Sequence, residues 1–364
     1  MGYDLRMADA DLYDYELPPE LIAQQALDRR DAARLLVVRR SDGTLAHRHI
    51  RDLPDLLEPG DLVVVNDTRV VPARLIGRRA ATGGKWEGLF LQAEPEQGVW
   101  RILAHTRGRP AIGERVILVD RAGHDALTLE LIGRAGGGTW LAVPDATGPA
   151  AEILEQVGRV PLPGYIRGGE ETQGDLDRYQ TVFARERGSA AAPTAGLHFT
   201  EDLLAALTAR GIHRASVTLH VGLDTFRPIT ADSLEDHPMH TEWCACPAET
   251  ATAVRETKAR GGRVIAVGTT AVRTLETAAA RSPAGTLAAW SGPTDLFIKP
   301  GFSFRVIDGL LTNFHMPRTT LMVLVSTFAS RELIRLAYEE AIRERYRFLS
   351  YGDAMLIMGE SLRS

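Results

Sequence analysis

Histidines stand beside carboxylate side chains at two places in this chain, and these are the groups that most often move protons in enzymes. In residues 218–226, His220 is followed four positions later by Asp224. A carboxylate near an imidazole can fix its tautomer and raise its basicity, as a general base requires. The alternative is a histidine that only satisfies a hydrogen bond within a strand.

Residues 236–242, with the sequence DHPMHTE, hold two histidines among acidic residues, which suggests a metal site. Pro238 argues against a regular helix face here, and the spacing matches no standard zinc site. We therefore expect no metal and predict substrate binding or acid–base catalysis for His240 and Glu242. A solvated loop is the alternative.

Residues 191–200, with the sequence AAPTAGLHFT, combine small residues with His198 directly before a predicted helix. Small residues let the backbone approach a ligand, and the N–H groups at a helix start can bind an anion. We predict that this loop binds substrate through Pro193, Thr194, Gly196 and Phe199. An ordinary capped loop is the alternative.

Polar residues also follow two apolar runs. Residues 66–69, with the sequence NDTR, come directly after the run 62–65, and loops at strand ends often carry binding residues. A solvated hinge would have the same composition. Asn313 and His315 precede the run 321–325, with Asp353 as a possible companion near the C-terminus. Asn can read a base edge, although a packed turn is the alternative.

Helices alternating with strands must position these groups. In residues 248–280 a helix should end at Gly261 and Gly262, and the apolar run 264–267 should form a strand covered on both faces. Gly268-Thr269-Thr270 then leads into a second helix with a threonine as N-cap. Further helices should begin at Thr200, and after Ser330 over about 331–345.

The segment of about 70–143 has a different pattern. It contains six short apolar runs separated by turn residues, with the sequences ARLIGRR, WEGLFLQ, VWRILAH, ERVILVD, LTLELIG and TWLAV. Such runs predict a small antiparallel barrel or sandwich. We therefore predict an α/β main domain made of residues 1–66 and 150–364, with a β domain inserted at 67–149.

Composition narrows the function classes. The net charge is −5 and no run of basic residues occurs, so any RNA must bind through a local patch of Lys and Arg. The N-terminus lacks the apolar region of a signal peptide, and no apolar run is long enough to cross a membrane. Cys244 and Cys246 are expected to be reduced thiols, so we expect a cytoplasmic protein.

Together these stretches resemble one family, the S-adenosylmethionine:tRNA ribosyltransferase-isomerases of queuosine biosynthesis. The matching segments run in the family's order along almost the whole chain: YDYELPPELIAQQAL, PGDLVVVNDTRVVPARL, VPLPGYI, RYQTVFA, AAPTAGLHFT, VTLHVGLDTFRPI, DHPMHTE, GGRVIAVGTTAVRTLE, LFIKPGF, LTNFHMPRTTLMVLVSTFA and YRFLSYGDAML.

The resemblance implies an α/β domain with an inserted six-stranded antiparallel β-barrel. It also implies transfer and isomerisation of the ribosyl group of S-adenosylmethionine onto 7-aminomethyl-7-deazaguanine at the wobble position of a tRNA with a GUN anticodon. Epoxyqueuosine forms, and adenine and methionine are released. The implied cofactor set is S-adenosylmethionine as a consumed co-substrate, with no prosthetic group. We expect a monomer with no membrane partner and no obligate protein partner.

Such chemistry needs a base poised near neutral pH, a group that assists adenine loss, and exclusion of water. The candidates for proton transfer are His198, His220, His240, Glu242, His315 and Asp353. The candidates for substrate binding, beside the loop 191–200, are Phe226, Gly268, Thr269, Thr270 and Asn313. Arginine suits phosphate and carboxylate groups, and the predicted tRNA contacts are Arg69, Arg74 and Arg273.

The chain departs from the family pattern at Gly164, where a second proline is expected, and at Asp224, where glycine is commoner. No functional role is expected at Trp243 and Cys244. Three other functions remain open, one of them that of a paralogue with the family fold that acts on another acceptor. A methyltransferase would release S-adenosylhomocysteine, but its glycine-rich loop is not evident. A non-catalytic RNA-binding module would retain tRNA without consuming S-adenosylmethionine.

Overall fold

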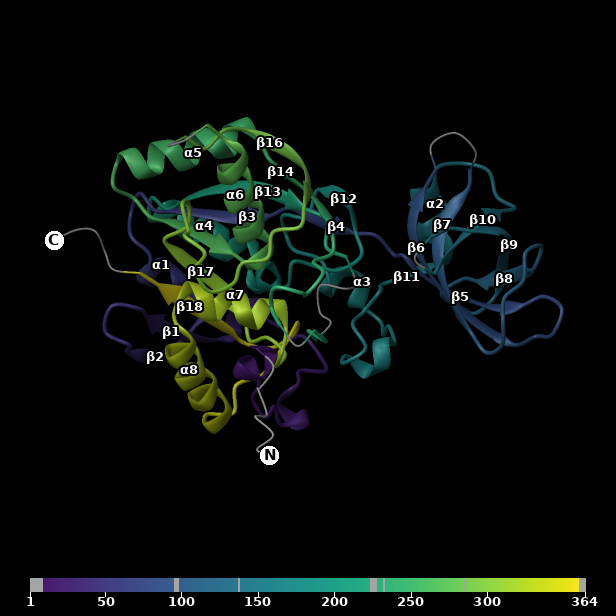
Figure 1. Cartoon of the computed structure of the whole chain (residues 1–364), viewed down its shortest axis with the longest axis horizontal. Coiled ribbons are helices and arrows are strands. Elements are labelled where there is room, and N and C mark those ends of the chain that lie inside the picture. Colours follow the sequence, from purple (N-terminus) through teal and green to yellow (C-terminus); the bar gives the residue numbers. More distant parts are fainter. Residues whose placement is uncertain are drawn as a thin grey trace, which may run out of the picture. The chain divides into compact units, whose positions relative to one another are not determined.

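The computed structural model describes residues 9–94, 98–136, 138–222, 228–231, 233–283 and 286–359 (Figure 1). The chain divides into two compact units. One consists of Met1–Arg69 with Gln180–Ser364, and the other of Val70–Tyr179. The predicted domain limits, at residues 66/67 and 149/150, stay a prediction about which segment folds on its own.

The first unit is built on a mixed sheet with the strand order β16-β14-β13-β3-β15-β17-β18-β1-β2. Its strands are β1 (Arg34–Arg39), β2 (Leu45–His49), β3 (Leu62–Asn66), β13 (His213–Leu219), β14 (Glu242–Cys246), β15 (Val264–Val267), β16 (Trp290–Thr294), β17 (Gly309–Asn313) and β18 (Ala354–Met358). The central strands β13, β3, β15 and β17 are parallel, and β14 and β18 flank them in the antiparallel sense.

Alternate residues of the central strands point to opposite faces of the sheet, and each face is covered. One face presents Val65, Val267 and Leu311 to a core that includes α4 (Glu201–Ala209) and α1 (Leu53–Leu56). Burial on both faces explains why the run Val264–Val267 is apolar throughout, as predicted.

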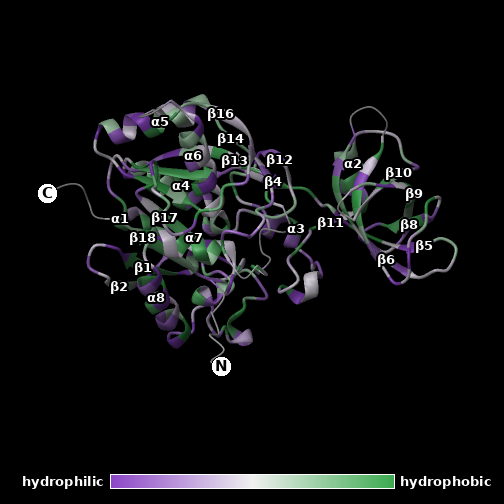
Figure 2. Ribbon diagram, in the orientation of Figure 1, coloured by the Kyte–Doolittle hydropathy of each residue, from purple (hydrophilic) through white to green (hydrophobic). Residues whose placement is uncertain are grey.

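The opposite face of the sheet, called here the α6 face, is covered by a second group of helices. Those that contact the central strands are α5 (Ala248–Ala259) and α6 (Thr269–Arg281). After β17 the chain forms α7 (Thr320–Phe328) and α8 (Arg331–Arg343), which contact each other. The central strands and α7 are hydrophobic, whereas α8 alternates hydrophobic and hydrophilic residues (Figure 2). This pattern agrees with the burial of most of α7 and of only one side of α8.

The parallel strands bring several of the predicted polar residues to one edge of the sheet. Because β3, β13, β15 and β17 run the same way, their carboxyl ends meet at this edge. Asn66, His220, Gly268 and Asn313 lie at or just after those four ends. Ligands of open α/β sheets commonly bind outside such an edge.

The second unit confirms the prediction of six antiparallel strands. They are β5 (Arg74–Arg79), β6 (Lys85–Ala93), β7 (Trp100–Thr106), β8 (Arg115–Val119), β9 (Asp125–Arg134) and β10 (Thr139–Pro144). Pairing of β5 with β8 closes the sheet, so the structure is a barrel rather than an open sandwich. A two-residue strand, β11 (Gly158–Arg159), pairs with β5 in the antiparallel sense.

The barrel core also contains a helix. In α2 (Ala150–Val157) the buried residues are Ile153, Leu154 and Val157, and they pack with barrel residues such as Trp86 and Trp100. The sequence places these apolar residues at helical spacing directly after the last strand. A segment beyond residue 149 therefore contributes to the core of this unit.

The helix starts confirm two predicted caps and correct a third. The hydroxyls of Thr200 and Ser330 accept hydrogen bonds from the backbone N–H groups of Leu203 and Leu333, as N-caps do. The prediction of a threonine cap for α6 was wrong, because Gly268 is the N-cap, with a φ of 86°. Within the described residues, no helix has the length and apolar character needed to cross a membrane.

Candidate active site

His220 lies at the carboxyl end of β13, half-buried, with one ring nitrogen engaged. Its Nδ1 is 2.8 Å from the hydroxyl of Thr68, and that hydroxyl is 3.4 Å from the backbone oxygen of Glu186. If Nδ1–H donates to the Thr68 oxygen, the Thr68 hydroxyl can donate to Glu186 in turn. This assignment leaves Nε2 with a free lone pair, as a general base requires.

The surroundings of His220 keep its imidazole neutral. Desolvation lowers the pKa of His220 below its ordinary value, and the nearby carboxylates of Glu186 and Asp67 oppose that shift. The carboxylates beside His220 therefore come from other segments of the chain. Asp224, which the sequence suggested as the partner, lies outside the described residues.

Two residues that sequence reasoning did not select shape the His220 site. Trp243, expected to have no role, stacks on the imidazole with a centroid distance of 5.3 Å and an interplanar angle of 20°. A Cβ at Gly188 would lie only 2.9 Å from the ring, so glycine is needed there. The register between β13 and β14 brings Trp243 opposite His220, and that pairing could not be deduced from spacing along the chain.

Arg273 and Glu242 form a buried ion pair on the α6 face of the sheet. The side chain of each is only 5% exposed, and Glu242 also accepts a hydrogen bond from the backbone N–H of Gly222. Arg273 donates through Nε to the backbone oxygen of Leu296, 3.1 Å away. Its Nη2 is buried without a hydrogen-bond partner, an arrangement that a bound acceptor group would relieve.

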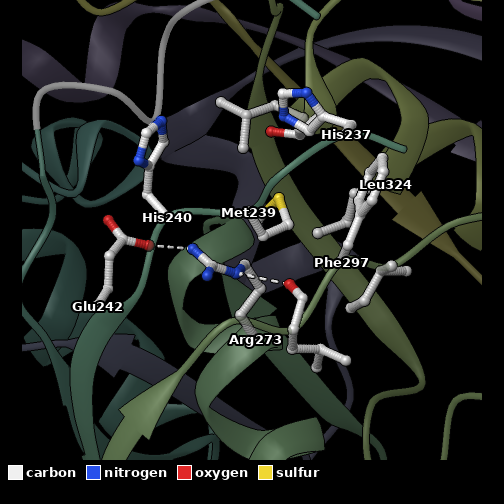
Figure 3. Close-up of a pocket in the computed structure, with 11 residues that line it drawn as sticks. His237, Met239, His240, Glu242, Arg273, Phe297 and Leu324 are labelled. Atoms are coloured by element: carbon white, nitrogen blue, oxygen red, sulfur yellow. Dashed lines mark hydrogen bonds and ion pairs between the residues drawn. The ribbon is translucent and has the colours of Figure 1, made fainter. Parts of the chain in front are cut away.

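A small pocket opens beside this ion pair (Figure 3). Its apolar wall includes Met239, Phe297 and Leu324, and both His237 and His240 line it. The pocket has a volume of about 40 Å³, which suits a carboxylate-sized group rather than a whole nucleoside. The structure thus brings His240, Glu242 and Arg273 together, as Figure 3 shows.

His198 is buried and contacts Asn313. The side chain of Asn313 donates to the backbone oxygen of Leu349 at 2.9 Å, which identifies the atom facing His198 as the amide nitrogen. That nitrogen is 3.3 Å from His198 Nε2, so Nε2 accepts and Nδ1 carries the proton. Desolvation, assisted by the charges of Arg347 and Arg30, lowers the pKa of His198 to about 4.

The loop that carries His198 packs against the start of α6. It forms a 3₁₀ helix over Thr194–His198, preceded by Pro193 and followed by the buried Phe199. A Cβ at Gly196 would approach Phe183 and Thr181 to 2.9 Å, and one at Gly268 would lie 3.5 Å from Ala195. Thr269 and Thr270 are buried in the first turn of α6, and the hydroxyl of Thr270 has no partner.

His315 and Asp353 are held by contacts that look structural. The Nε2 of His315 is 2.8 Å from the Thr312 hydroxyl, and desolvation lowers its pKa to about 3. Asp353 accepts hydrogen bonds from the backbone N–H groups of Arg34 and Arg347, at 2.9 Å and 2.8 Å. Both groups are buried, which favours positioning over proton transfer.

The three predicted tRNA-binding arginines occupy different environments. Arg69 is exposed and lies in β4 (Thr68–Val70), which pairs with β12 (Glu186–Ser189). Arg74 belongs to the barrel unit, where it donates to the backbone oxygen of Gly169 and pairs with Glu87. The burial of Arg273 favours a role inside the pocket over a phosphate contact. The remaining candidate, Phe226, lies outside the described residues.

Strand pairing shows which of these groups share a face of the sheet. Ser216 is paired with Val65, so Ser216 and, by alternation, Thr218 and His220 lie on the face covered by α4. Asn313 lies on that face too, two residues after Leu311. Arg273 and Glu242 lie on the α6 face. Among the described residues, no group of three metal-ligating side chains occurs.

Comparisons with known proteins agree on one family. The family model described as "Queuosine biosynthesis protein" matches residues 10–357. The S-adenosylmethionine:tRNA ribosyltransferase-isomerase of Moorella thermoacetica is 51% identical over 95% of this chain and 98% of its own length. A crystal structure of S-adenosylmethionine tRNA ribosyltransferase from Thermotoga maritima matches with a TM-score of 0.54 and 37% identity, covering 95% of this chain and all of that one.

Proposed function

Because the chain belongs to the queuosine biosynthesis family of S-adenosylmethionine:tRNA ribosyltransferase-isomerases, we propose that its acceptor is 7-aminomethyl-7-deazaguanine at the wobble position of a GUN-anticodon tRNA. The ribosyl group of S-adenosylmethionine is transferred to the aminomethyl nitrogen and isomerised. The product base is epoxyqueuosine, and adenine and methionine leave. The relationship to the Moorella enzyme over almost the whole of both chains carries this proposal.

We place the methionyl carboxylate of S-adenosylmethionine in the pocket beside Arg273, which has room for a group of that size. An α-amino acid presents a carboxylate and an ammonium group, and the pocket offers a guanidinium and a carboxylate. The unpartnered Nη2 of Arg273 would donate to the methionyl carboxylate in a charge-assisted hydrogen bond. Met239 and Phe297 would contact the apolar chain, and an aromatic face attracts a sulfonium.

His220 is the best-supported general base. The positive sulfonium acidifies the C5′ protons of the bound S-adenosylmethionine, and removal of one of them starts the elimination that expels adenine. The tRNA amine then attacks, and closure of the epoxide expels methionine. Such a base must be neutral and reachable. His220 is half-buried with a lowered pKa, and the tautomer with the proton on Nδ1 would leave its Nε2 available.

Two exposed arginines near His220 are the proposed tRNA contacts. Arg69 and Arg185 lie in and just before the paired strands β4 and β12 and are exposed, and Thr68 of β4 contacts His220. Both arginines would meet phosphates next to the reacting nucleotide. The unpartnered Oδ1 of Asn313 would accept a hydrogen bond from an N–H of the deazaguanine.

The test is one incubation of the protein with S-adenosylmethionine and a GUN-anticodon tRNA that carries the aminomethyl-deazaguanine, followed by chromatography of the small molecules. We expect adenine and methionine in equal amounts, only when the modified tRNA is present. The matched control is the same tRNA with guanine at the wobble position, which lacks the amine. Adenine release that is equal with both tRNAs would contradict the proposed acceptor, and S-adenosylhomocysteine would show methyl transfer instead.

A further inference from the structure

A second, larger cavity lies between the N-terminal segment and the helices α7 and α8. Its volume is about 480 Å³, within the range of about 300–1,000 Å³ for small-ligand sites. From the geometry of this cavity we infer that it binds an unstacked nucleobase of the tRNA substrate, separate from the base that reacts. This inference rests on the proposed function, because it takes tRNA as the substrate.

Three tyrosines contribute to the cavity wall. Tyr13 and Tyr15 line it from the N-terminal segment, and Tyr338 lines it from α8. The hydroxyl of Tyr15 donates to the backbone oxygen of His315, and the backbone N–H of His315 donates to Tyr338 at 2.8 Å. The wall is thereby joined to the loop that follows Asn313. Unstacked RNA bases are typically held by stacking on such rings.

One buried hydroxyl in the cavity wall lacks a partner. Ser326 of α7 is 5% exposed, and its Oγ makes no hydrogen bond although it lies in the wall. Met322, one helical turn earlier, lines the same cavity, whereas Leu321 and Leu324 line the pocket beside Arg273. Helix α7 therefore separates two ligand spaces. A hydroxyl can donate to or accept from the polar edge of a base.

The charges around the cavity favour an uncharged ring over a free anion. Three arginines line it, Arg331, Arg335 and Arg343, together with three acidic residues, Asp14, Glu16 and Glu339. Each arginine also lies within 3.4 Å of a glutamate of its own helix. A balanced rim does not hold a free phosphate strongly. A neutral base linked to the tRNA backbone suits it, since the arginine planes can stack on the ring.

The test is a double-mutant cycle that combines a change in the protein with a change in an anticodon stem-loop RNA. The affinity for the RNA is measured by fluorescence polarisation without S-adenosylmethionine. On the RNA, one base at a time is removed from the loop. On the protein, Ser326→Phe fills the cavity. Stacking of a base on aromatic rings predicts a loss of about tenfold in affinity when the recognised base is removed. We expect Ser326→Phe to cause a similar loss with the intact RNA, and the two changes together to cost no more than either alone.

Two exposed substitutions cover the case in which Ser326→Phe does not fold. Arg335 is 70% exposed and pairs with Glu339. Arg335→Ala should weaken RNA binding, and Glu339→Gln should strengthen it, since a negative charge near the RNA is removed. Arg210→Ala, at a 52% exposed arginine of the α4 side that pairs with Asp55, is the matched control and should change nothing.

Two results would overturn the inference. In the first, removing each loop base lowers the affinity of Ser326→Phe for the RNA as much as it lowers that of the wild-type protein. In the same result, Arg335→Ala and Glu339→Gln bind the RNA as the control variant does. The second is unchanged RNA affinity in Ser326→Phe with a raised KM for S-adenosylmethionine, because the occupant would then be the small substrate. Both results come from RNA-binding measurements. A failure of the proposed ribosyl transfer would instead appear as absence of adenine release in the activity assay, so the two failures can be distinguished.

Discussion

Replacement of His220 tests the proposed mechanism most directly. A positioned general base contributes about 10²- to 10⁴-fold to a rate. His220→Ala should therefore lower kcat/KM for the modified tRNA by that factor, which corresponds to about 3–5 kcal/mol of transition-state stabilisation. The fold should survive, because the imidazole is only half-buried and its main packing partner, Trp243, is itself 46% exposed.

Thr68→Val is the second variant of a double-mutant cycle with His220→Ala. It removes the hydroxyl that lies 2.8 Å from His220 Nδ1 but keeps the shape of the side chain. Loss of one hydrogen bond of about 0.5–1.5 kcal/mol predicts a rate about 2- to 12-fold lower. If Thr68 acts only through His220, the same change in the His220→Ala background should have no further effect on the rate.

The assay is the initial rate of adenine release with saturating S-adenosylmethionine and varied modified tRNA. His213→Ala is the matched control, because His213 is exposed at the opposite end of the same strand. Thermal unfolding of each variant separates lost chemistry from lost structure. A rate within a few-fold of wild type in His220→Ala, with the protein folded, would refute the assignment of His220 as the base.

Three further predictions concern Trp243, Arg273 and two buried histidines. Trp243→Ala exposes His220 and weakens the desolvation that lowers its pKa, so the acidic limb of the pH–kcat/KM profile should move to higher pH; an unchanged limb would contradict this cause. Arg273→Met leaves Glu242 buried without its partner and should lower the free energy of unfolding by about 3–5 kcal/mol in urea titrations, whereas the double variant Arg273→Met/Glu242→Leu should regain most of it. His198 and His315 have native pKa values of about 4 and about 3 against an ordinary 6.5, so the unfolded chain binds their protons first and stability should fall as the pH drops below 6.5. Between pH 6.5 and 5 the two sites together should lower the free energy of unfolding by about 3 kcal/mol, and Asp353 and Glu276, whose native pKa values are raised by desolvation, oppose this loss. In urea titrations at the two pH values, His315→Gln should show roughly half of the loss.

Much of the fold could be predicted because its signals are local. Short apolar runs separated by turn residues predicted all six barrel strands, and the continuous apolar run at Val264–Val267 predicted a strand buried on both faces. The cap of α6 was missed since it depends on backbone conformation: Gly268 adopts a positive φ that leaves the threonines inside the helix. The stacking of Trp243 on His220 was also missed, because strand register is a long-range property.

Candidate residues could be chosen from the sequence by their type, but their grouping could not be predicted. Glu242 was expected to help in proton transfer, whereas the structure pairs it with Arg273, 31 positions later. Arg273 was assigned to tRNA because an arginine reads as a surface phosphate contact unless its burial is known. The sequence alone does not distinguish His315 from His220 as a candidate for catalysis. The structure does, because the 312–315 turn and Tyr338 enclose His315.

Strand order shows which strands carry the two histidines' surroundings relative to the Arg273 pocket. Glu242 begins β14, the immediate neighbour of β13, but the side chains of Glu242 and His220 point to opposite faces of the sheet. Asn313, the partner of His198, ends β17, three spacings or about 14 Å from β13. The strand that carries His220 is therefore closer to β14 than to the strand that carries Asn313. A substrate whose methionyl end reaches Arg273 must cross the end of the sheet between β14 and β3 to present C5′ to His220. We propose that the tRNA base enters from the side of His198 and Asn313.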